Sequence, residues 1–346
     1  MPLSPEEYVT LGSDLILQLL DDQLAAPWLE VEARLADLPW TSSGQRVDPH
    51  HLSEARVRLE RSRRLQITRS RTRGGRDIGL LQATGGRRAT AIEVAARRKR
   101  LLMGRYLGWS QGSPSRPGLI GPAGERAVHA SLLASGSFVL ANPNGGQTNR
   151  FLDVHLPGAL DNAGFYIPLT TGLPGQPVSF AVEVKNQRDW IYPVSQELYQ
   201  LLDKAALLQR TRPQQLLVPI LICRRAHLTA FRMAKDLGFF IIDTQRQYIS
   251  TIDNEALNEV RAELGLLDLT ADTGPDPRII RRMTLTFPPH AATSAARWRQ
   301  AGSDLTLGSY FTAMRQNSYV RARQDLLHDL RRHVDENLGM YEGQGW

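Results

Sequence analysis

The sequence predicts an α/β protein with a mixed central sheet flanked by helices, a helical domain before the sheet and a helical region after it. From about residue 119 to residue 252, segments with helical apolar spacing alternate with short runs rich in β-branched residues. Helical spacing dominates the chain on either side of this stretch. At 346 residues the chain is also too long for one ordinary core, so two or three domains are expected.

Composition and spacing divide the chain into three expected parts. Residues 1–110 form an N-terminal domain, residues 119–255 the α/β domain, and residues 256–346 a helical C-terminal region. A run rich in Ser, Gly and Pro at 110–118 predicts a linker between the first two. The function of the last part stays open.

The composition excludes several classes of protein. Hydrophobic residues make up 42% and charged residues 22%, as in globular proteins, and no apolar run approaches the length of a membrane span. The acidic N-terminus lacks the apolar core of a signal peptide, and Cys223 is the only cysteine. We therefore expect a cytoplasmic protein without internal disulfides, cysteine-based zinc sites or membrane contacts. Residues 73–79 are glycine-rich but lack the Gly-Lys-Ser/Thr ending of a P-loop, so no nucleotide cofactor is expected.

The net charge of +7 is distributed unevenly along the chain. Residues 1–54 hold 2 basic and 10 acidic residues, whereas residues 55–106 hold 16 basic and 3 acidic residues. Basic side chains neutralise phosphates and release counterions, so a local excess of this kind is typical of a nucleic-acid partner. A solvated, arginine-rich surface is the alternative.

The basic segment lies in a pattern that resembles a winged helix-turn-helix domain. Helical spacing at 13–24, 27–38 and 48–65 is followed by strand-like stretches at 66–70 and 77–82. The resemblance implies that the third helix lies in the major groove and that the hairpin reaches the DNA backbone or minor groove. The DNA-contacting residues would then be Arg56, Arg61, Arg63 and Arg64 on the helix and Arg71, Arg73 and Arg76 on the hairpin. A helical dimerisation or scaffold domain is the alternative.

Four residues of the α/β domain indicate a site for a divalent cation. Glu183 and Lys185 are two apart on the β-rich run 178–185, so both side chains point to one face, opposite Val182 and Val184. An acid and an amine on an otherwise apolar strand are costly unless they serve each other or a metal. Asp153, in a strand-like stretch, and Glu125, in the helix expected at 121–135, complete an oxygen-rich set suited to Mg²⁺.

This set resembles the PD-(D/E)xK nuclease superfamily, which has the restriction-endonuclease-like fold. Asp153 is followed thirty residues later by Glu183-Val184-Lys185, and Glu125 lies in the helix that opens the core. The proline of the motif's name is absent, since Leu152 precedes Asp153. The resemblance implies that Asp153, Glu183 and the Val184 carbonyl hold Mg²⁺, with Mn²⁺ as a substitute. It also implies that Glu125 serves a second metal or its water, and that Lys185 orients or deprotonates the attacking water.

We therefore expect a metal-dependent DNA endonuclease serving restriction, anti-phage defence or a mobile element. Double-strand cleavage needs two active sites, so a homodimer is expected as well. One alternative is a DNA-binding regulator with an inert nuclease-like domain, and another is a nuclease for RNA or for branched or single-stranded DNA. Gln196 and Gln200 lie one turn apart in the helix after the motif and are expected to be ordinary polar surface, although they could contact the site. His155, two residues after Asp153, is likewise expected to lie outside the site.

Overall fold

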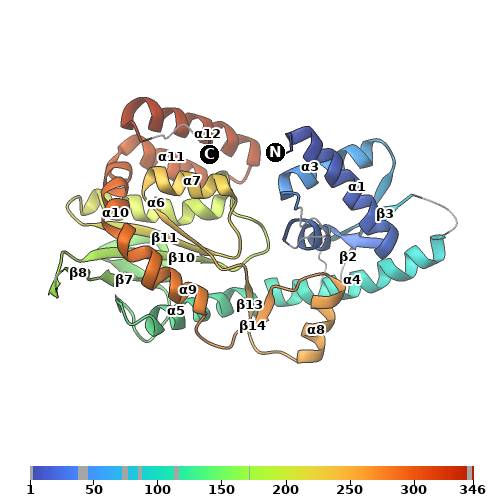
Figure 1. The fold of residues 1–346 in the computed structure, drawn as a ribbon, viewed down its shortest axis with the longest axis horizontal. Coiled ribbons are helices and arrows are strands. Elements are labelled where there is room, and N and C mark those ends of the chain that lie inside the picture. The colour runs from blue at the N-terminus through green and yellow to red at the C-terminus, as the bar shows by residue number, and fades with distance from the viewer. Residues whose placement is uncertain are drawn as a thin grey trace. The chain divides into compact units, whose positions relative to one another are not determined.

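The computed structural model describes residues 3–37, 46–71, 77–84, 88–112, 117–170, 172–340 and 345–346. The chain forms two compact units, each with its own core (Figure 1). Unit 1 comprises Met1–Ile120 and Ile249–Ala271, and unit 2 comprises Gly121–Tyr248 and Asp272–Trp346. Within the described ranges, no helix combines the length and the apolar character that crossing a bilayer requires.

Unit 1 consists of helices around a small antiparallel sheet with the strand order β1-β3-β2. The first helix begins with a capping box, in which Glu7 N–H donates to Ser4 Oγ at 3.3 Å and Ser4 N–H to Glu7 Oε2 at 2.6 Å. The elements before the linker are α1 (Pro5–Gln23), β1 (Ala25–Pro27), α2 (Trp28–Glu32), the π-helical turn η1 (Ala33–Asp37), α3 (Pro49–Arg61), β2 (Leu65–Arg71), β3 (Asp77–Ala83) and α4 (Ala89–Gln111).

Residues 249–271 return to unit 1, although we expected the α/β domain to end at residue 255 and the C-terminal region to begin at residue 256. The chain enters at β13 (Gln247–Ile249), continues through α8 (Asn254–Glu263) and leaves after β14 (Leu269–Ala271). Apolar packing holds this stretch in unit 1, because Leu257 and Val260 of α8 are buried in the same cluster as Leu102 and Tyr106 of α4. The expected boundary at 255/256 is therefore wrong.

Unit 2 contains the mixed central sheet that the sequence predicts. Its strands follow the order β12-β11-β10-β7-β4, with β10, β11 and β12 parallel, and β7 antiparallel to both of its neighbours. The elements are α5 (Ile120–Ala134), β4 (Phe138–Leu140), β5 (Thr148–Phe151), β6 (Val154–Leu160), β7 (Asn162–Tyr166), β8 (Leu169–Thr170), β9 (Leu173–Pro174), β10 (Val178–Lys185), α6 (Gln196–Thr211), β11 (Leu217–Cys223), α7 (Leu228–Leu237) and β12 (Phe240–Asp243).

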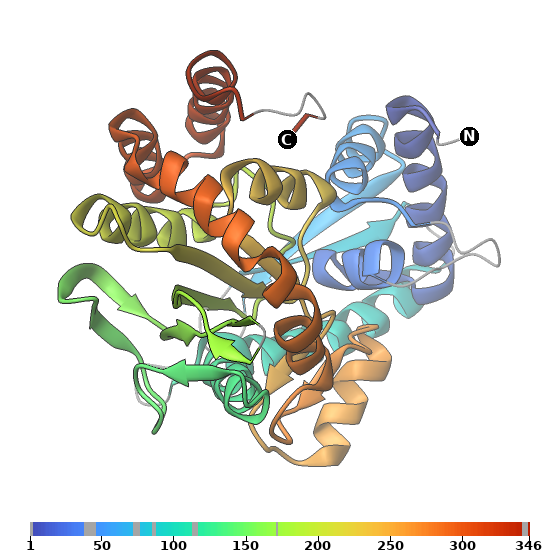
Figure 2. The same cartoon turned by 60° about the vertical axis from the view of Figure 1, so that its left-hand side comes forward.

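Two apolar layers cover the sheet of unit 2, because its central strands are buried on both faces. Phe180 and Val182 of β10 pack in one layer with residues of α5 and α10. Ala181, next to them in sequence, packs in the other layer with residues of α6, α7 and α11. Figure 2 shows α10 (Phe287–Ser303) running diagonally across the sheet. This alternation is what turns one face of β10 toward α6.

We expected residues 256–346 to form a separate C-terminal region, but from Asp272 on the chain belongs to unit 2. After Ala271 the chain forms α9 (Pro277–Arg281), the π-helical turn η3 (Arg282–Thr286), α10, α11 (Leu305–Gln316), α12 (Val320–His333) and the π-helical turn η4 (Val334–Leu338). Trp298 of α10 is fully buried and stacks on Phe311 of α11, with ring centroids 6.0 Å apart. Both belong to the cluster that also contains Leu201 of α6. These helices thus complete the core of the sheet domain.

Trp298→Ala should therefore lower the free energy of unfolding of unit 2 by about 3–5 kcal/mol, because it leaves a large cavity between α6, α10 and α11. Leu305→Ala on α11 is the control, since Leu305 is 75% exposed, and should change this free energy by less than about 0.5 kcal/mol. Urea unfolding followed by circular dichroism measures both. Equal effects of the two substitutions would contradict a shared core.

Candidate functional site

The candidate site is centred on Glu183 at the end of β10. Glu183 is 5% exposed and lies on the face of β10 that turns toward α6. Lys185, two residues on, donates from Nζ to Glu183 Oε1 at 2.8 Å, so the two side chains share one face, as the spacing predicts. Val182 and Val184 pack in the opposite layer.

Helix α6 contributes an amide and a second lysine to this face. Lys204 is 3% exposed and donates from Nζ to Glu183 Oε2 at 2.5 Å and to the carbonyl of Ala159 at 2.6 Å. One turn earlier on α6, Gln200 Oε1 accepts from Lys185 Nζ at 2.7 Å. The Glu183 carboxylate is thus held between two ammonium groups, one from the strand and one from the helix.

Asp161 lies beside Glu183 and is the acidic residue that the sequence analysis missed. It lies in the bend before β7, where the β7–β10 register pairs Asn162 with Val182. Its Oδ2 accepts from Val184 N–H at 2.7 Å and its Oδ1 from Gln147 Nε2 at 2.9 Å. Asp161 is 8% exposed. Burial, followed by the negative charge of Glu183, raises the pKa of Asp161 above its ordinary value.

Glu125 reaches the same group from α5. At the preceding residue, a Cβ on Gly124 would lie 2.5 Å from Asn186 Cβ, so glycine is what allows α5 to pack against the chain directly after β10. Burial raises the pKa of Glu125, and the charges of Asp161 and Glu183 raise it further. The Glu125 carboxylate makes no hydrogen bond or ion pair with any residue of the described ranges, and only the more distant charges of Lys185 and Arg126 lower its pKa. Glu125 therefore adds a third carboxylate to the group.

Asp153, expected in this group, lies elsewhere. It occupies the two-residue turn between β5 and β6, where Leu152 and Asp153 have φ values of 52° and 61°. Positive φ at both central residues is the geometry of a type I′ hairpin turn, and Asp tolerates it. The Asp153 side chain is 77% exposed and is paired with Arg150 at 3.4 Å and Arg212 at 3.8 Å. We correct the acidic position of the site from Asp153 to Asp161.

The same correction applies to the strand. We expected the strand-like residues 149–156, which include Asp153, to lie beside β10, and residues 157–177 to form an insertion or a wide hairpin. The hairpin β5–β6 instead forms its own two-stranded sheet, and the antiparallel neighbour of β10 is β7. His155 is exposed on β6, as expected. Gln196 bonds the Arg315 carbonyl, whereas Gln200 contacts Lys185, contrary to the surface position that we expected for it.

Three carboxylates and two ammonium groups thus meet at one end of β10. Asp161 and Glu125 have raised pKa values because they lie near Glu183 in a poorly solvated region. A cation bound between these carboxylates would lower both pKa values. Carboxylate oxygens are the ligands that Mg²⁺ and Mn²⁺ prefer. Asp161, Glu183 and Glu125 are therefore the residues that could hold a divalent ion. Lys204 is the functional residue whose signal was overlooked: it is one of only 4 lysines, against 38 arginines, in the chain.

The arginines expected to contact DNA lie in different environments within unit 1. Helix α3 ends at Arg61, so Arg63 and Arg64 lie in the turn before β2 and not on the helix, as we had expected. All three are exposed, and their side chains make no ion pair with a described residue.

The remaining expected contacts are less free. The Arg56 guanidinium lies 4.7 Å from the ring centroid of Trp28 and is half-buried, so packing occupies it. Arg71 pairs with Asp77 across the hairpin at 3.1 Å. Arg73 and Arg76 lie outside the described residues. Arg61, Arg63 and Arg64 are thus the expected residues with exposed, uncompensated charge.

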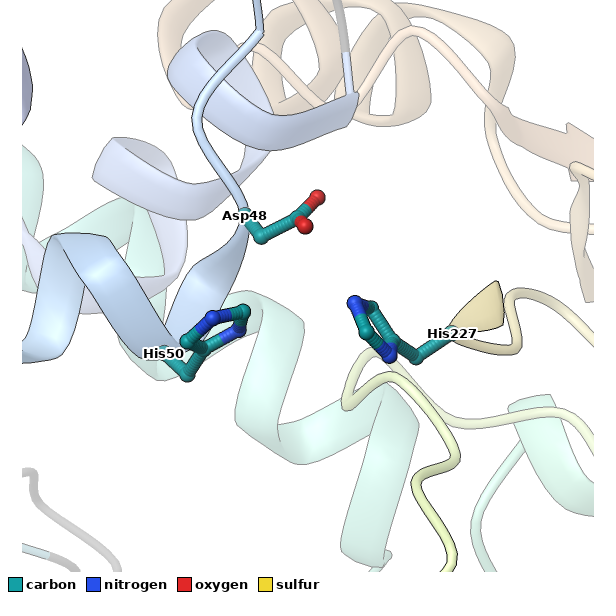
Figure 3. A group of neighbouring side chains, drawn as sticks. All are labelled: Asp48, His50 and His227. Carbon is teal, nitrogen blue, oxygen red and sulfur yellow. The ribbon is translucent and has the colours of Figure 1, made fainter. Parts of the chain in front are cut away.

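Three further side chains of metal-binding type lie at helix starts (Figure 3). In unit 1, Asp48 is the N-cap residue of α3 and His50 lies in its first turn. In unit 2, His227 is the N-cap residue of α7: its Nδ1 accepts from Thr229 N–H at 3.3 Å, and its ring stacks on Tyr192. Because Asp48 and His50 belong to one unit and His227 to the other, no common site is assigned to them.

The raised pKa of Asp161 has a testable consequence for stability. The folded protein holds the Asp161 proton more tightly than the unfolded chain does, so the ionised carboxylate opposes folding. Below the ordinary pKa of 3.8 the carboxyl is protonated in both the folded and the unfolded chain and does not oppose folding. This part of the stability is lost as the pH rises through the raised pKa of the folded protein. In EDTA at pH 7, Asp161→Asn should therefore raise the free energy of unfolding by about 0.5–2 kcal/mol, the usual range for a stabilising substitution. Thermal unfolding at several pH values measures this gain, which should shrink as pH falls toward 3.8.

Asp153→Asn is the matched control, since the exposed turn carboxylate should change stability by less than about 0.5 kcal/mol at any of these pH values. Adding Mg²⁺ or Mn²⁺ should then stabilise the wild type and Asp153→Asn more than Asp161→Asn. A loss of stability in Asp161→Asn at pH 7 without metal would show that the hydrogen bonds of this carboxylate outweigh its electrostatic cost.

Comparison with known proteins gives no family for this chain. No protein-family model, no curated protein and no solved structure matches it. The chemistry of the site therefore rests on its own geometry: three carboxylates, an amide and two lysines at the end of a buried strand.

Proposed function

We propose that this protein is a metal-dependent DNA endonuclease of the PD-(D/E)xK type, with Glu125, Asp161, Glu183 and Lys185 as its site. The observation that carries the proposal is the electrostatics of this group. Two carboxylates with raised pKa values converge on Glu183, where a divalent cation would satisfy all three. Asp161 takes the place that the sequence analysis gave to Asp153.

The topology around the site supports the proposal. Helix α5 is followed by the antiparallel strands β4, β7 and β10, then by α6 and the parallel strand β11. This order resembles the restriction-endonuclease-like core, in which the acid-x-Lys strand is central. Fold likeness alone does not establish an activity, so the proposal depends on the side chains.

The donor set fits a hard cation such as Mg²⁺, with Mn²⁺ as a substitute. Asp161, Glu183 and the carbonyl of Val184 would hold it, and Glu125 would serve a second ion or its water. The Glu183 oxygens already accept from two lysines, but each carboxylate oxygen has a further lone pair to offer. Such a cation supplies Lewis-acid stabilisation to the charge that develops on a phosphodiester.

The lysines perform different tasks in this proposal. Lys185 is half-buried and fixed between Glu183 and Gln200, so its amine can orient the attacking water or stabilise the phosphorane charge. Lys204 is deeper, and its second bond goes to the Ala159 carbonyl. We assign Lys204 to positioning, because it holds Glu183 without facing a substrate.

Unit 1 supports DNA as the substrate. Its order of α1, β1, α2, α3, β2 and β3, with the antiparallel sheet β1-β3-β2, resembles a winged helix. In that fold the third helix enters the major groove and the hairpin follows the backbone. The exposed charges of Arg61, Arg63 and Arg64 lie at the last residue of α3 and in the turn that follows it. Double-strand cleavage by a homodimer, in restriction, anti-phage defence or a mobile element, remains part of the proposal.

Cleavage of supercoiled plasmid in Mg²⁺ tests the nuclease and the corrected residue together. Lys185→Ala should slow cleavage by about 10²–10⁴-fold, the range for a positioned general acid or base. Asp161→Asn should slow it by at least about 100-fold, because losing a metal ligand costs more than losing its outer-sphere support. Asp153→Asn should cleave at close to the wild-type rate.

The order of these rates decides between the two aspartates. A slow Asp153→Asn with an active Asp161→Asn would restore the residue first expected. Equal rates for every variant would indicate a contaminating nuclease. DNA binding without cleavage in Mg²⁺ or Mn²⁺ would favour a DNA-binding regulator with an inert nuclease-like domain. Faster cleavage of RNA or single-stranded DNA than of duplex DNA would favour a nuclease for those substrates.

The DNA contacts of unit 1 can be tested without cleavage. Arg61→Gln/Arg64→Gln should weaken duplex binding by about tenfold or more in EDTA, because two phosphate or base contacts are lost. Arg88→Gln/Arg105→Gln removes the same charge from residues already paired with Asp21 and Glu259, and should change binding little. Gel-shift titration at one fixed salt concentration measures both, and equal losses would indicate a general charge effect.

A further inference from the structure

A group of arginines in unit 2 lines a cavity at the end of β12. The cavity has a volume of about 410 Å³. Its lining residues are Asp243, Gln245, Pro277, Arg278, Arg281 and Arg282. The arginines are spaced i, i+3 and i+4 along the continuous helical segment α9–η3, so they project from one face of it.

Within the part of the chain that the structure describes, only one of these guanidinium groups has a hydrogen-bond partner. Arg278 donates from Nη1 to the Thr244 carbonyl at 2.8 Å and to Gln245 Oε1 at 3.3 Å. Arg281 and Arg282 are exposed, and their side chains have no hydrogen bond or ion pair with any residue that the structure describes. Both therefore keep all five N–H donors for a ligand or for water.

The charges that face the cavity favour an anion. Its single lining carboxylate, Asp243, accepts from Gln245 N–H at 3.0 Å and is thus partly satisfied within its own turn. The nearest acid on the helix side, Asp276, accepts from Arg278 N–H, Arg246 and Tyr248. Three guanidinium groups thus oppose one lining carboxylate. Guanidinium binds phosphate through two parallel hydrogen bonds, which makes arginine the usual residue for this ligand.

The register of the sheet relates this cavity to the candidate site. Lys185 pairs with Cys223, and Cys223 pairs with Asp243, so the three lie in one row across three parallel strands. Two strand spacings separate Lys185 from Asp243, or about 10 Å. Successive phosphates of one DNA strand rise about 3.4 Å along the helix axis and lie farther apart than that along the winding backbone. The row is therefore long enough to separate a scissile phosphate from a neighbouring phosphate of the same strand.

We propose that Arg278, Arg281 and Arg282 bind a neighbouring backbone phosphate of the DNA strand whose scissile phosphodiester lies at Lys185. This subsite rests on the proposed nuclease function and extends it. It fixes the path of the strand along the carboxyl edge of the sheet. It reads no base, since guanidinium contacts to phosphate carry no sequence information.

The salt dependence of DNA binding tests the subsite in a background that cannot cleave. In Lys185→Ala protein with EDTA, anisotropy of one fluorescein-labelled duplex gives the slope of log K against log salt. Arg281→Gln/Arg282→Gln should reduce that slope by up to about 0.9, the contribution of one phosphate contact. Arg278 is left intact because it also holds the turn at Gln245.

Arg299→Gln/Arg321→Gln is the matched control. Both residues are exposed in unit 2 and unpaired with described residues, so the pair removes the same net charge. Its slope should equal that of the background protein. The subsite would be overturned if both double variants kept the slope of the background protein, or if both reduced it equally. It would also be overturned if the background protein bound no DNA.

Plasmid cleavage by the wild type separates this proposal from the one on which it rests. Cleavage together with equal slopes would leave the nuclease standing and remove the subsite. A slope reduced only in Arg281→Gln/Arg282→Gln, with no cleavage by the wild type, would keep the phosphate contact and remove the nuclease.

Discussion

Glu183 carries a carboxylate into the interior of unit 2, and Lys185 and Lys204 meet it from the strand and from the helix. Desolvating such a group costs several kcal/mol, which its partners offset only when every lone pair and proton is used. Removing either lysine would leave part of that charge unpaired, which is typically more costly than never having buried it. The packing of α6 on β10 therefore depends on this three-residue cluster as well as on the apolar side chains around it.

The charge of the cluster changes sign once its neighbours are counted, because Glu183, Lys185 and Lys204 sum to +1 and two further carboxylates bring the sum to −1. Asp161 and Glu125 add two carboxylates, and no further cation is bound to either one among the described residues. A fold selected only for stability would remove them, since buried, mutually repelling acids oppose folding at neutral pH. Perturbed acids gathered at one strand end are the usual signature of a functional site, where stability is given up for chemistry. The same groups that destabilise the metal-free protein are those that would hold the ion.

The sequence allowed β10 and its motif to be predicted because a buried strand alternates its faces, and Glu183 and Lys185 break the apolar pattern on one face only. It did not allow the third acid to be predicted, for a local reason. Leu152-Asp153 forms a hairpin turn without the Asn-Gly or Asp-Gly pair that marks such turns, so residues 149–156 read as one strand. Because of that error, β7 was not predicted as the strand beside β10, and Asp161, which precedes β7, was not predicted as a site residue. The return of residues 249–271 to unit 1 was not predicted, because long-range packing and not local composition assigns this stretch to unit 1.

A signal for Lys204 was nevertheless present in the choice of cation. In a chain with 38 arginines and 4 lysines, Lys99, Lys185 and Lys204 each bond a glutamate, Glu30 in unit 1 or Glu183 in unit 2. The ammonium group is a compact point charge with three rotatable donors, whereas a guanidinium is planar and needs a wider space. Each of these three amines makes at least two bonds at different angles, which a guanidinium would not satisfy in the same volume. Lysine in an arginine-rich chain thus indicates where the interior holds a polar cluster, and on α6 that signal points directly at the site.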